Sequence, residues 1–156
     1  MVALAPVTAV DLSPVRTACL AYNAAECQPP SRYPIEIHTG DIHMMVDTLP
    51  TDAWVHIDPA RRSAGRRSAR YDDLIPGPAF LDRLFARVRG GAVKLSPAVD
   101  FASLPAGHLE VISHRGTVVQ AVLWRGFPFS TDSRTATVIG DTGPVWSIQG
   151  LPESVE

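Results

Sequence analysis

The sequence predicts an α/β fold with a mostly parallel sheet, and three observations support this class. Segments with strand propensity alternate with segments of helical periodicity from residue 7 to residue 104. Aspartates stand at or just after the ends of three of the strand-like segments, at positions 11, 41 and 58. The later strands, 108–113 and 117–124, are separated by only three residues, which suits an antiparallel hairpin.

The first half of the chain contains three predicted strands and two predicted helices. Residues 7–11 form a short apolar run, and Ser13-Pro14 then supplies a helix N-cap followed by proline at the first helical position. Apolar residues recur at helical spacing to Ala25, and Gln28-Pro29-Pro30 ends the helix. The remaining predicted elements are a strand at 35–38, a weak helix at 43–49 and a strand at 53–58.

The second half begins with a polar stretch, residues 60–78, which we interpret as a loop because it is rich in arginine and ends in Pro76-Gly77-Pro78. An amphipathic helix at 79–88 follows, because its apolar residues lie on one helical face. The further predicted elements are a strand at 92–95, a short helix at 99–104, the hairpin of 108–113 and 117–124, and two short strands at 135–139 and 145–148.

Composition indicates a globular protein that does not enter the membrane. Hydrophobic residues make up 46% of the 156 residues and charged residues 19%. No apolar run approaches the roughly 20 residues that span a bilayer, and the N-terminus lacks a basic signal-peptide region, so we expect a cytoplasmic protein. Cys19 and Cys27 lie about 12 Å apart on one predicted helix, too far for a disulfide, and are expected to be buried free thiols.

The charges are unevenly distributed along the chain, although the net charge is only −2. Acidic residues dominate positions 1–60, whereas positions 61–73 contain five arginines. A basic segment of this kind fits the phosphates of a nucleic acid, although a solvated loop has the same composition. The five arginines are Arg61, Arg62, Arg66, Arg67 and Arg70.

The strand-end aspartates suggest a nucleotide-like ligand, because ligands of parallel sheets bind beyond the carboxyl ends of the strands. Asp11 can accept hydrogen bonds from both hydroxyls of a ribose. Asp41 can accept one from an adenine amino group, and Gly40 lets a ligand approach the backbone. Each acid taken alone is also a common residue at the junction between a strand and a loop.

Four segments of the chain resemble, in order and spacing, the motifs that follow the glycine-rich loop of class I S-adenosylmethionine-dependent methyltransferases. They are most similar to a bacterial group that carries a THUMP-like domain. Residues 120–126 and 134–138 are similar to later strands of that group, so the resemblance covers roughly residues 7–140. The four segments are Val10-Asp11-Leu12-Ser13-Pro14, Thr39-Gly40-Asp41, Ile57-Asp58-Pro59-Ala60-Arg61-Arg62 and Val93-Lys94-Leu95-Ser96-Pro97.

This resemblance implies a Rossmann-like methyltransferase sheet that lacks its first strand, with a partial methyltransferase domain at 1–126 and a C-terminal β-hairpin extension at 127–156. It implies S-adenosylmethionine as cofactor and RNA as substrate, with no metal. The residues implied at the cofactor are Asp11, Leu12, Gly40 and Asp41. Those implied in catalysis are Asp58, Pro59 and Arg61, and those implied in substrate binding are Arg61, Arg62, Arg66, Arg67 and Lys94.

The sequence departs from the family pattern at two places. Many amino-methylating enzymes have a second proline and an aromatic residue where this chain has Ala60 and Arg61. The glycine-rich loop and first strand should precede Val7, so we expect these residues alone to bind the cofactor weakly or not at all. A second copy of the chain, or a missing N-terminal segment, is expected to complete the sheet.

Two other functions remain open at this point. The first is a non-catalytic relic of the same fold that serves as an RNA-binding module. The second is half of a nucleotide-binding oxidoreductase, for which no nicotinamide motif follows Asp11. The five histidines show no metal-ligand spacing, and Ser96 and Ser113 lack a convincing general base for a hydrolase triad, so the sequence favours a methyltransferase.

Overall fold

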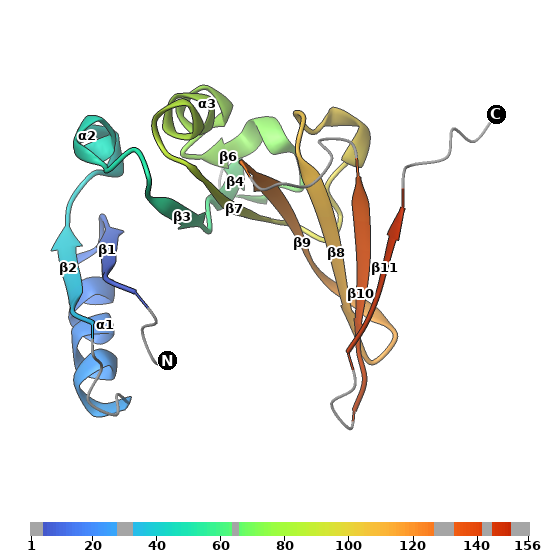
Figure 1. The fold of residues 1–156 in the computed structure, drawn as a ribbon, viewed down its shortest axis with the longest axis horizontal. Coiled ribbons are helices and arrows are strands. Elements are labelled where there is room, and N and C mark those ends of the chain that lie inside the picture. The colour runs from blue at the N-terminus through green and yellow to red at the C-terminus, as the bar shows by residue number, and fades with distance from the viewer. Residues whose placement is uncertain (1–4, 28–32, 64–65, 127–132, 142–144, 151–156) are drawn as a thin grey trace. The chain divides into compact units, whose positions relative to one another are not determined.

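A computed structural model describes residues 5–27, 33–63, 66–126, 133–141 and 145–150 of the chain (Figure 1). The chain divides into two compact units, Met1–Thr48 and Leu49–Glu156. Each unit is described by itself below. No helix among the described ranges is long and apolar enough to cross a membrane.

Unit 1 consists of two parallel strands and the helices that follow them (Figure 1). Strand β1 (Val7–Asp11) leads into α1 (Pro14–Cys27), and α1 leads to β2 (Ile35–Thr39), which pairs with β1. The parallel register aligns Val7 with Ile35 and Asp11 with Thr39, so both strands end at the same edge. Helix α2 (Ile42–Met45) and the 3-10 helix η1 (Val46–Thr48) follow. The strands and helices predicted before residue 49 are therefore confirmed.

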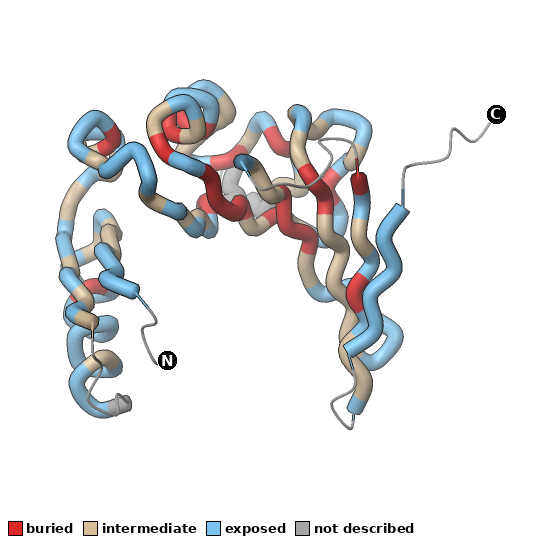
Figure 2. The backbone as a smooth tube through the Cα atoms, viewed as in Figure 1, coloured by how far each residue is buried: buried red, intermediate tan, exposed pale blue. Residues whose placement is uncertain are grey.

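Few residues of unit 1 are buried (Figure 2). Among its described residues, only Thr17 and Val46 are buried. The Thr17 hydroxyl lies 2.6 Å from the Thr39 hydroxyl and ties α1 to the end of β2. The prediction of two buried thiols is wrong for Cys19, which is free and exposed; the side chain of Cys27 lies outside the described residues. Much of α1 is exposed, so its apolar spacing does not correspond to a buried face.

Unit 2 is built on a mixed sheet of six strands in the order β11-β10-β8-β9-β7-β3. Strands β3, β7, β8 and β10 run in one direction, while β9 and β11 run in the other. The α/β class is confirmed, but the sheet is mixed rather than mostly parallel, because β9 lies between β7 and β8 and is antiparallel to both. The strands are β3 (Trp54–Ile57), β7 (Gly90–Leu95), β8 (His108–His114), β9 (Thr117–Arg125), β10 (Arg134–Ile139) and β11 (Val145–Gly150).

Helix α3 (Pro78–Arg87) contributes three buried residues to the core of unit 2 (Figure 2). Gly77 and Pro78 begin it, since proline suits the first helical position. Arg125 of β9 donates to Asp82 at 2.7 Å and lies over the Phe85 ring, which fastens the helix to the sheet. Burial of each large aliphatic side chain stabilises the unit by about 2 kcal/mol. The largest fully buried side chains of the unit are Leu81, Leu84, Val93, Leu95 and Leu123.

The predicted loop at 60–78 is wrong in part, because much of it is ordered as a small three-stranded sheet. Strand β4 (Ala60–Ser63) pairs with β5 (Arg66–Arg67) on one side and with β6 (Leu74–Ile75) on the other. The 3-10 helix η2 (Tyr71–Asp73) precedes β6, and its Tyr71 is buried together with Leu74. Among the side chains of this segment that the structure describes, Tyr71 and Leu74 are buried in the core.

Candidate functional site

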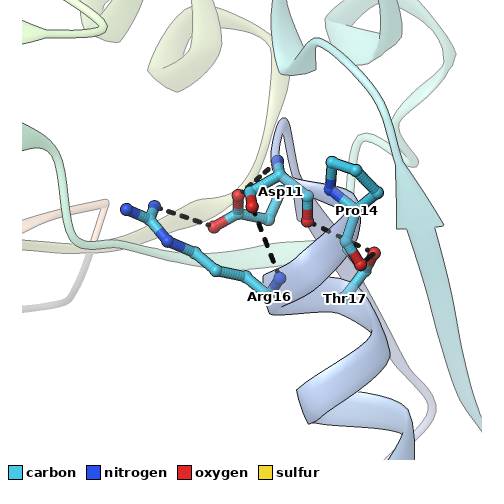
Figure 3. A network of polar contacts seen from close by, with 5 residues as sticks. Asp11, Pro14, Arg16 and Thr17 are labelled. Carbon is cyan, nitrogen blue, oxygen red and sulfur yellow. Dashed lines mark hydrogen bonds and ion pairs between the residues drawn. The ribbon is translucent and has the colours of Figure 1, made fainter.

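Asp11 ends β1 and faces the first turn of α1 (Figure 3). Its Oδ1 accepts a hydrogen bond from the Ser13 backbone N–H at 2.7 Å. Its Oδ2 lies 3.4 Å from Nη1 of Arg16, whose side chain is largely exposed. A carboxylate at a helix N-terminus is stabilised by the helix dipole. The family resemblance missed Arg16, although it lies one helical turn after Ser13.

The Thr39-Gly40-Asp41 segment lies at the same strand edge, as the resemblance implies. The Gly40 N–H donates to the Asp11 carbonyl at 3.0 Å, which joins the two segments directly. No heavy atom lies within 4 Å of the position that a Gly40 side chain would occupy. Oδ1 of Asp41 accepts from the His43 N–H at 2.8 Å and caps α2. Unit 1 therefore presents two carboxylates beside an open stretch of backbone, with the exposed Leu12 next to Asp11.

In unit 2, Asp58 follows β3 directly and forms an ion pair with Lys94, which lies on β7. The Lys94 Nζ donates to Asp58 Oδ2 at 3.0 Å, and the two side chains are 34% and 52% exposed. The pair forms because β3 and β7 are parallel neighbours whose carboxyl ends share one edge. Pro59 is buried after Asp58 and restricts the backbone there. The sequence placed Lys94 at the substrate and did not reveal this contact with Asp58.

The backbone positions of the basic residues lie on the small sheet. Arg61 and Arg62 belong to β4, and Arg66 and Arg67 belong to β5. Arg62 is opposite Arg67 in the antiparallel register. The side chains of these four arginines lie outside the described residues, so their contacts with a substrate stay a prediction.

The histidine with the best-defined contacts has a structural role. His108 is buried, and its Nδ1 lies 2.6 Å from the Ser133 hydroxyl while its Nε2 lies 3.0 Å from the Thr135 hydroxyl. These contacts join β8 to the start of β10. In the part of the chain that the structure describes, no cluster of three or more His, Cys, Asp or Glu side chains could hold a metal ion.

Comparison with known proteins points to one family. No protein-family model matches the chain. Two curated proteins of Mycobacterium tuberculosis, from strains CDC 1551 / Oshkosh and ATCC 25618 / H37Rv, are each 36% identical over 138 residues. Both are named as uncharacterized S-adenosylmethionine-dependent methyltransferases. The match covers 85% of this chain but only 36% of each relative, so the chain spans little more than a third of their length.

A solved structure supports the same fold. The crystal structure of a "putative methyltransferase" from Porphyromonas gingivalis W83 superposes with a TM-score of 0.71 and 18% identity. The superposition covers 92% of this chain and 38% of that one, and at this identity it shows the fold alone. The curated relatives confirm the predicted resemblance to S-adenosylmethionine-dependent methyltransferases, and the solved structure agrees with it in fold. The likeness to a group that carries a THUMP-like domain stays a prediction. The chain belongs to the class I S-adenosylmethionine-dependent methyltransferases.

Proposed function

We propose that this chain supplies cofactor- and substrate-binding residues of an S-adenosylmethionine-dependent RNA methyltransferase. Asp11, Leu12, Gly40 and Asp41 contact the cofactor in this proposal. The observation that carries it is the β1–β2 register, which puts Asp11 opposite Thr39 and next to Gly40-Asp41. A nucleoside needs acceptors for its ribose hydroxyls and its adenine amino group at one such edge.

The residues of unit 1 fit the nucleoside part of this cofactor. A carboxylate has about four lone-pair sites, and the contacts with Ser13 and Arg16 leave Asp11 able to accept from ribose hydroxyls. The Arg16 contact is long and exposed, so a ligand displaces it at little cost. The space beside Gly40 admits a flat ring against the backbone, with the exposed Asp41 carboxylate next to it.

The residues of unit 2 supply groups for positioning a methyl acceptor. When bound, S-adenosylmethionine supplies an electrophilic methyl group. The Asp58 carboxylate accepts a hydrogen bond from an N–H of the substrate and thereby orients the nitrogen lone pair. Lys94 holds one carboxylate oxygen in place, and Pro59 limits rotation of the chain behind it. Arg61 stacks on the substrate base or holds a phosphate, since it stands where many amino-methylating enzymes carry an aromatic residue.

Calorimetric titration of the chain with S-adenosylmethionine and S-adenosylhomocysteine tests the cofactor role. Any binding should be weak without the glycine-rich loop, and it should disappear in Asp11→Ala and weaken roughly tenfold in Gly40→Ala, because a methyl group fills the open space. Asp52→Ala, which changes another exposed acid, is the matched control and should bind normally. An unaltered titration of Asp11→Ala contradicts the proposed cofactor site.

RNA binding is expected both of the enzyme and of its alternative, a non-catalytic RNA-binding module of the same fold, so RNA and cofactor binding must be measured together. The observation that favours RNA binding is the pairing of strand β4 with strand β5, which places four arginines on adjacent strands. A variant with alanine at Arg61, Arg62, Arg66 and Arg67 should bind single-stranded RNA more weakly and with a shallower salt dependence, by about 0.7 per lost phosphate contact. RNA binding by the chain without any cofactor binding favours the module.

A further inference from the structure

Unit 2 contains a cavity of about 260 Å³ that is lined by none of the residues assigned to the cofactor or the substrate. One wall is the segment around η2, which contributes Arg70, Tyr71 and Asp72. The other wall is the segment after β7, which contributes Asp100 and Ser103. The family motifs include none of these five side chains.

The position of the cavity in the fold is that of a ligand site. Strands β3 and β7 are parallel neighbours, so the segments that follow them leave from the same edge of the sheet. One wall of the cavity belongs to the connection from β3 to α3, and the other wall follows β7 directly. The Asp58–Lys94 ion pair lies at this edge as well. Ligands of open α/β sheets bind beyond the carboxyl ends of such strands.

Local hydrogen bonds hold the η2 wall in shape. The Ser68 hydroxyl donates to Asp73 Oδ2 at 2.6 Å and accepts from the Arg70 N–H at 3.1 Å. Tyr71 and Leu74 are each only 5% exposed, and their burial anchors the wall to the core. The charged groups of Arg70 and Asp72 therefore project from a backbone that is already ordered.

The second wall is ordered in the same way. Asp100 Oδ1 accepts from the Ala102 N–H at 3.0 Å, and the Ser103 hydroxyl donates to the Asp100 carbonyl at 2.8 Å. The buried Val99 anchors this segment. A cavity with two walls held by their own contacts loses little conformational entropy when a ligand binds.

The cavity offers hydrogen-bond donors and acceptors of opposite charge to one small ligand. The Arg70 guanidinium and the Asp72 carboxylate are 4.0 Å apart and 78% and 74% exposed, so separating them costs little. Asp100 adds a second carboxylate, and Ser103 adds a hydroxyl. The volume is below the roughly 300 Å³ of the smallest drug-sized pockets, which suits one planar heterocycle. A simple anion is disfavoured by the two carboxylates.

We propose that this cavity binds an unpaired guanine base of the RNA substrate, an inference that rests on the proposed function. Guanine presents O6 and N7 as adjacent acceptors, which match the fork of Arg70. Its N1–H and N2 amino group are adjacent donors on the Watson–Crick edge, which match the carboxylate of Asp72 or Asp100. Adenine lacks the O6 acceptor and the paired donors, so it satisfies these groups poorly.

NMR titration of the full chain with GMP, AMP and ribose 5-phosphate tests the assignment. GMP should shift the backbone amide signals of residues 69–72 and 98–103, with a dissociation constant on the order of 1 mM. AMP should bind roughly tenfold more weakly, and ribose 5-phosphate should leave these amides unmoved. Arg70→Ala and Asp100→Asn should each weaken GMP binding roughly tenfold, while asparagine preserves the cap of the following turn.

Arg115→Ala is the control for the GMP titration and should bind GMP like the parent chain, since it removes an exposed arginine whose partner is Asp141. Three results would each overturn the guanine site. The first is equal shifts with ribose 5-phosphate, and the second is no shift with GMP at tenfold above the expected dissociation constant (about 10 mM). The third is unchanged GMP affinity in both variants. Failure of GMP with retained S-adenosylmethionine binding removes this inference alone. Retained GMP binding without cofactor binding contradicts the proposed enzyme and leaves a base-binding module.

Discussion

At the scale of single residues, the Asp58–Lys94 ion pair links two strand ends that the sequence analysis treated separately. Both side chains are partly exposed, so Lys94→Met should change the free energy of unfolding by no more than about 1 kcal/mol. Under the proposed function, methyl transfer by an enzyme that contains this chain should fall more strongly, on the order of tenfold, because Asp58 loses the contact that orients it. Urea unfolding and initial rates measure the two effects. A loss of stability that accounts for the whole fall in activity would show that Lys94 serves only the fold.

The pH dependence of the free energy of unfolding tests the burial of Tyr71. Burial raises the pKa of its hydroxyl above the ordinary value of 10.0, while nearby Arg125 lowers it and Asp82 raises it. A raised pKa in the folded state means that stability present below pH 10 is lost as the pH rises through the folded pKa. Tyr71→Phe cannot ionise, so it should lose less stability than the parent chain between pH 7 and about pH 11. Urea unfolding at the two pH values makes the comparison.

The same variant tests the buried hydroxyl itself. Tyr71 Oη has no hydrogen-bond partner among the described residues. Removing an unpaired buried polar group should leave the protein at least as stable at pH 7, with a change within about 1 kcal/mol. A marked destabilisation by Tyr71→Phe at pH 7 would reveal a hydrogen bond to this hydroxyl and contradict its unpaired state.

At the scale of elements, the β3–β7 contact depends on a glycine. A Cβ on Gly91 would lie 2.0 Å from the Val55 carbonyl oxygen, so Gly91→Ala must push the two backbones apart. We expect a loss of about 2–4 kcal/mol in the free energy of unfolding, measured by urea denaturation. Gly150→Ala on β11 is the matched control, because nothing lies within 4 Å of its Cβ position. Equal stability of the two variants would contradict the close approach of β3 and β7.

Sequence patterns located most helices and strands of the chain but not the small sheet of β4, β5 and β6. Helix α3 was predictable because its apolar residues recur on one helical face, which is a local signal. The small sheet was missed because its strands are two to four residues long and polar. These strands form because they pair with one another and because Tyr71 and Leu74 are buried. Local composition reveals neither the pairing nor the burial.

At the scale of the whole molecule, the two units differ in how much core they contain. Nearly all buried hydrophobic residues belong to unit 2, whereas Val46 alone represents unit 1 among the described residues. A fragment of residues 49–156 should therefore unfold cooperatively on its own, and a fragment of residues 1–48 should not. Circular dichroism during thermal unfolding measures both. A cooperative transition in the smaller fragment would contradict this expectation.

Completion of the sheet remains a prediction at this scale. Within the described residues, β1 pairs with β2 only and β3 pairs with β7 only. Unpaired strand edges favour association with another chain or segment. Analytical ultracentrifugation of the chain should therefore show a concentration-dependent dimer if a second copy completes the sheet. The predicted boundary between a domain at 1–126 and an extension at 127–156 likewise stays a proposal. Strands β10 and β11, which follow this boundary, pair within the same six-stranded sheet as β8.

The sequence by itself determined the family, the α/β class and the strand-end positions of Asp11, Gly40-Asp41 and Asp58-Pro59. These features are encoded by contiguous motifs and by short-range periodicity. Only the tertiary structure decided that Lys94 contacts Asp58, that the sheet is mixed, and that Arg70 and Asp100 face one cavity. The physical reason is that strand order and side-chain contacts join residues far apart in the chain, and packing of the whole unit selects them.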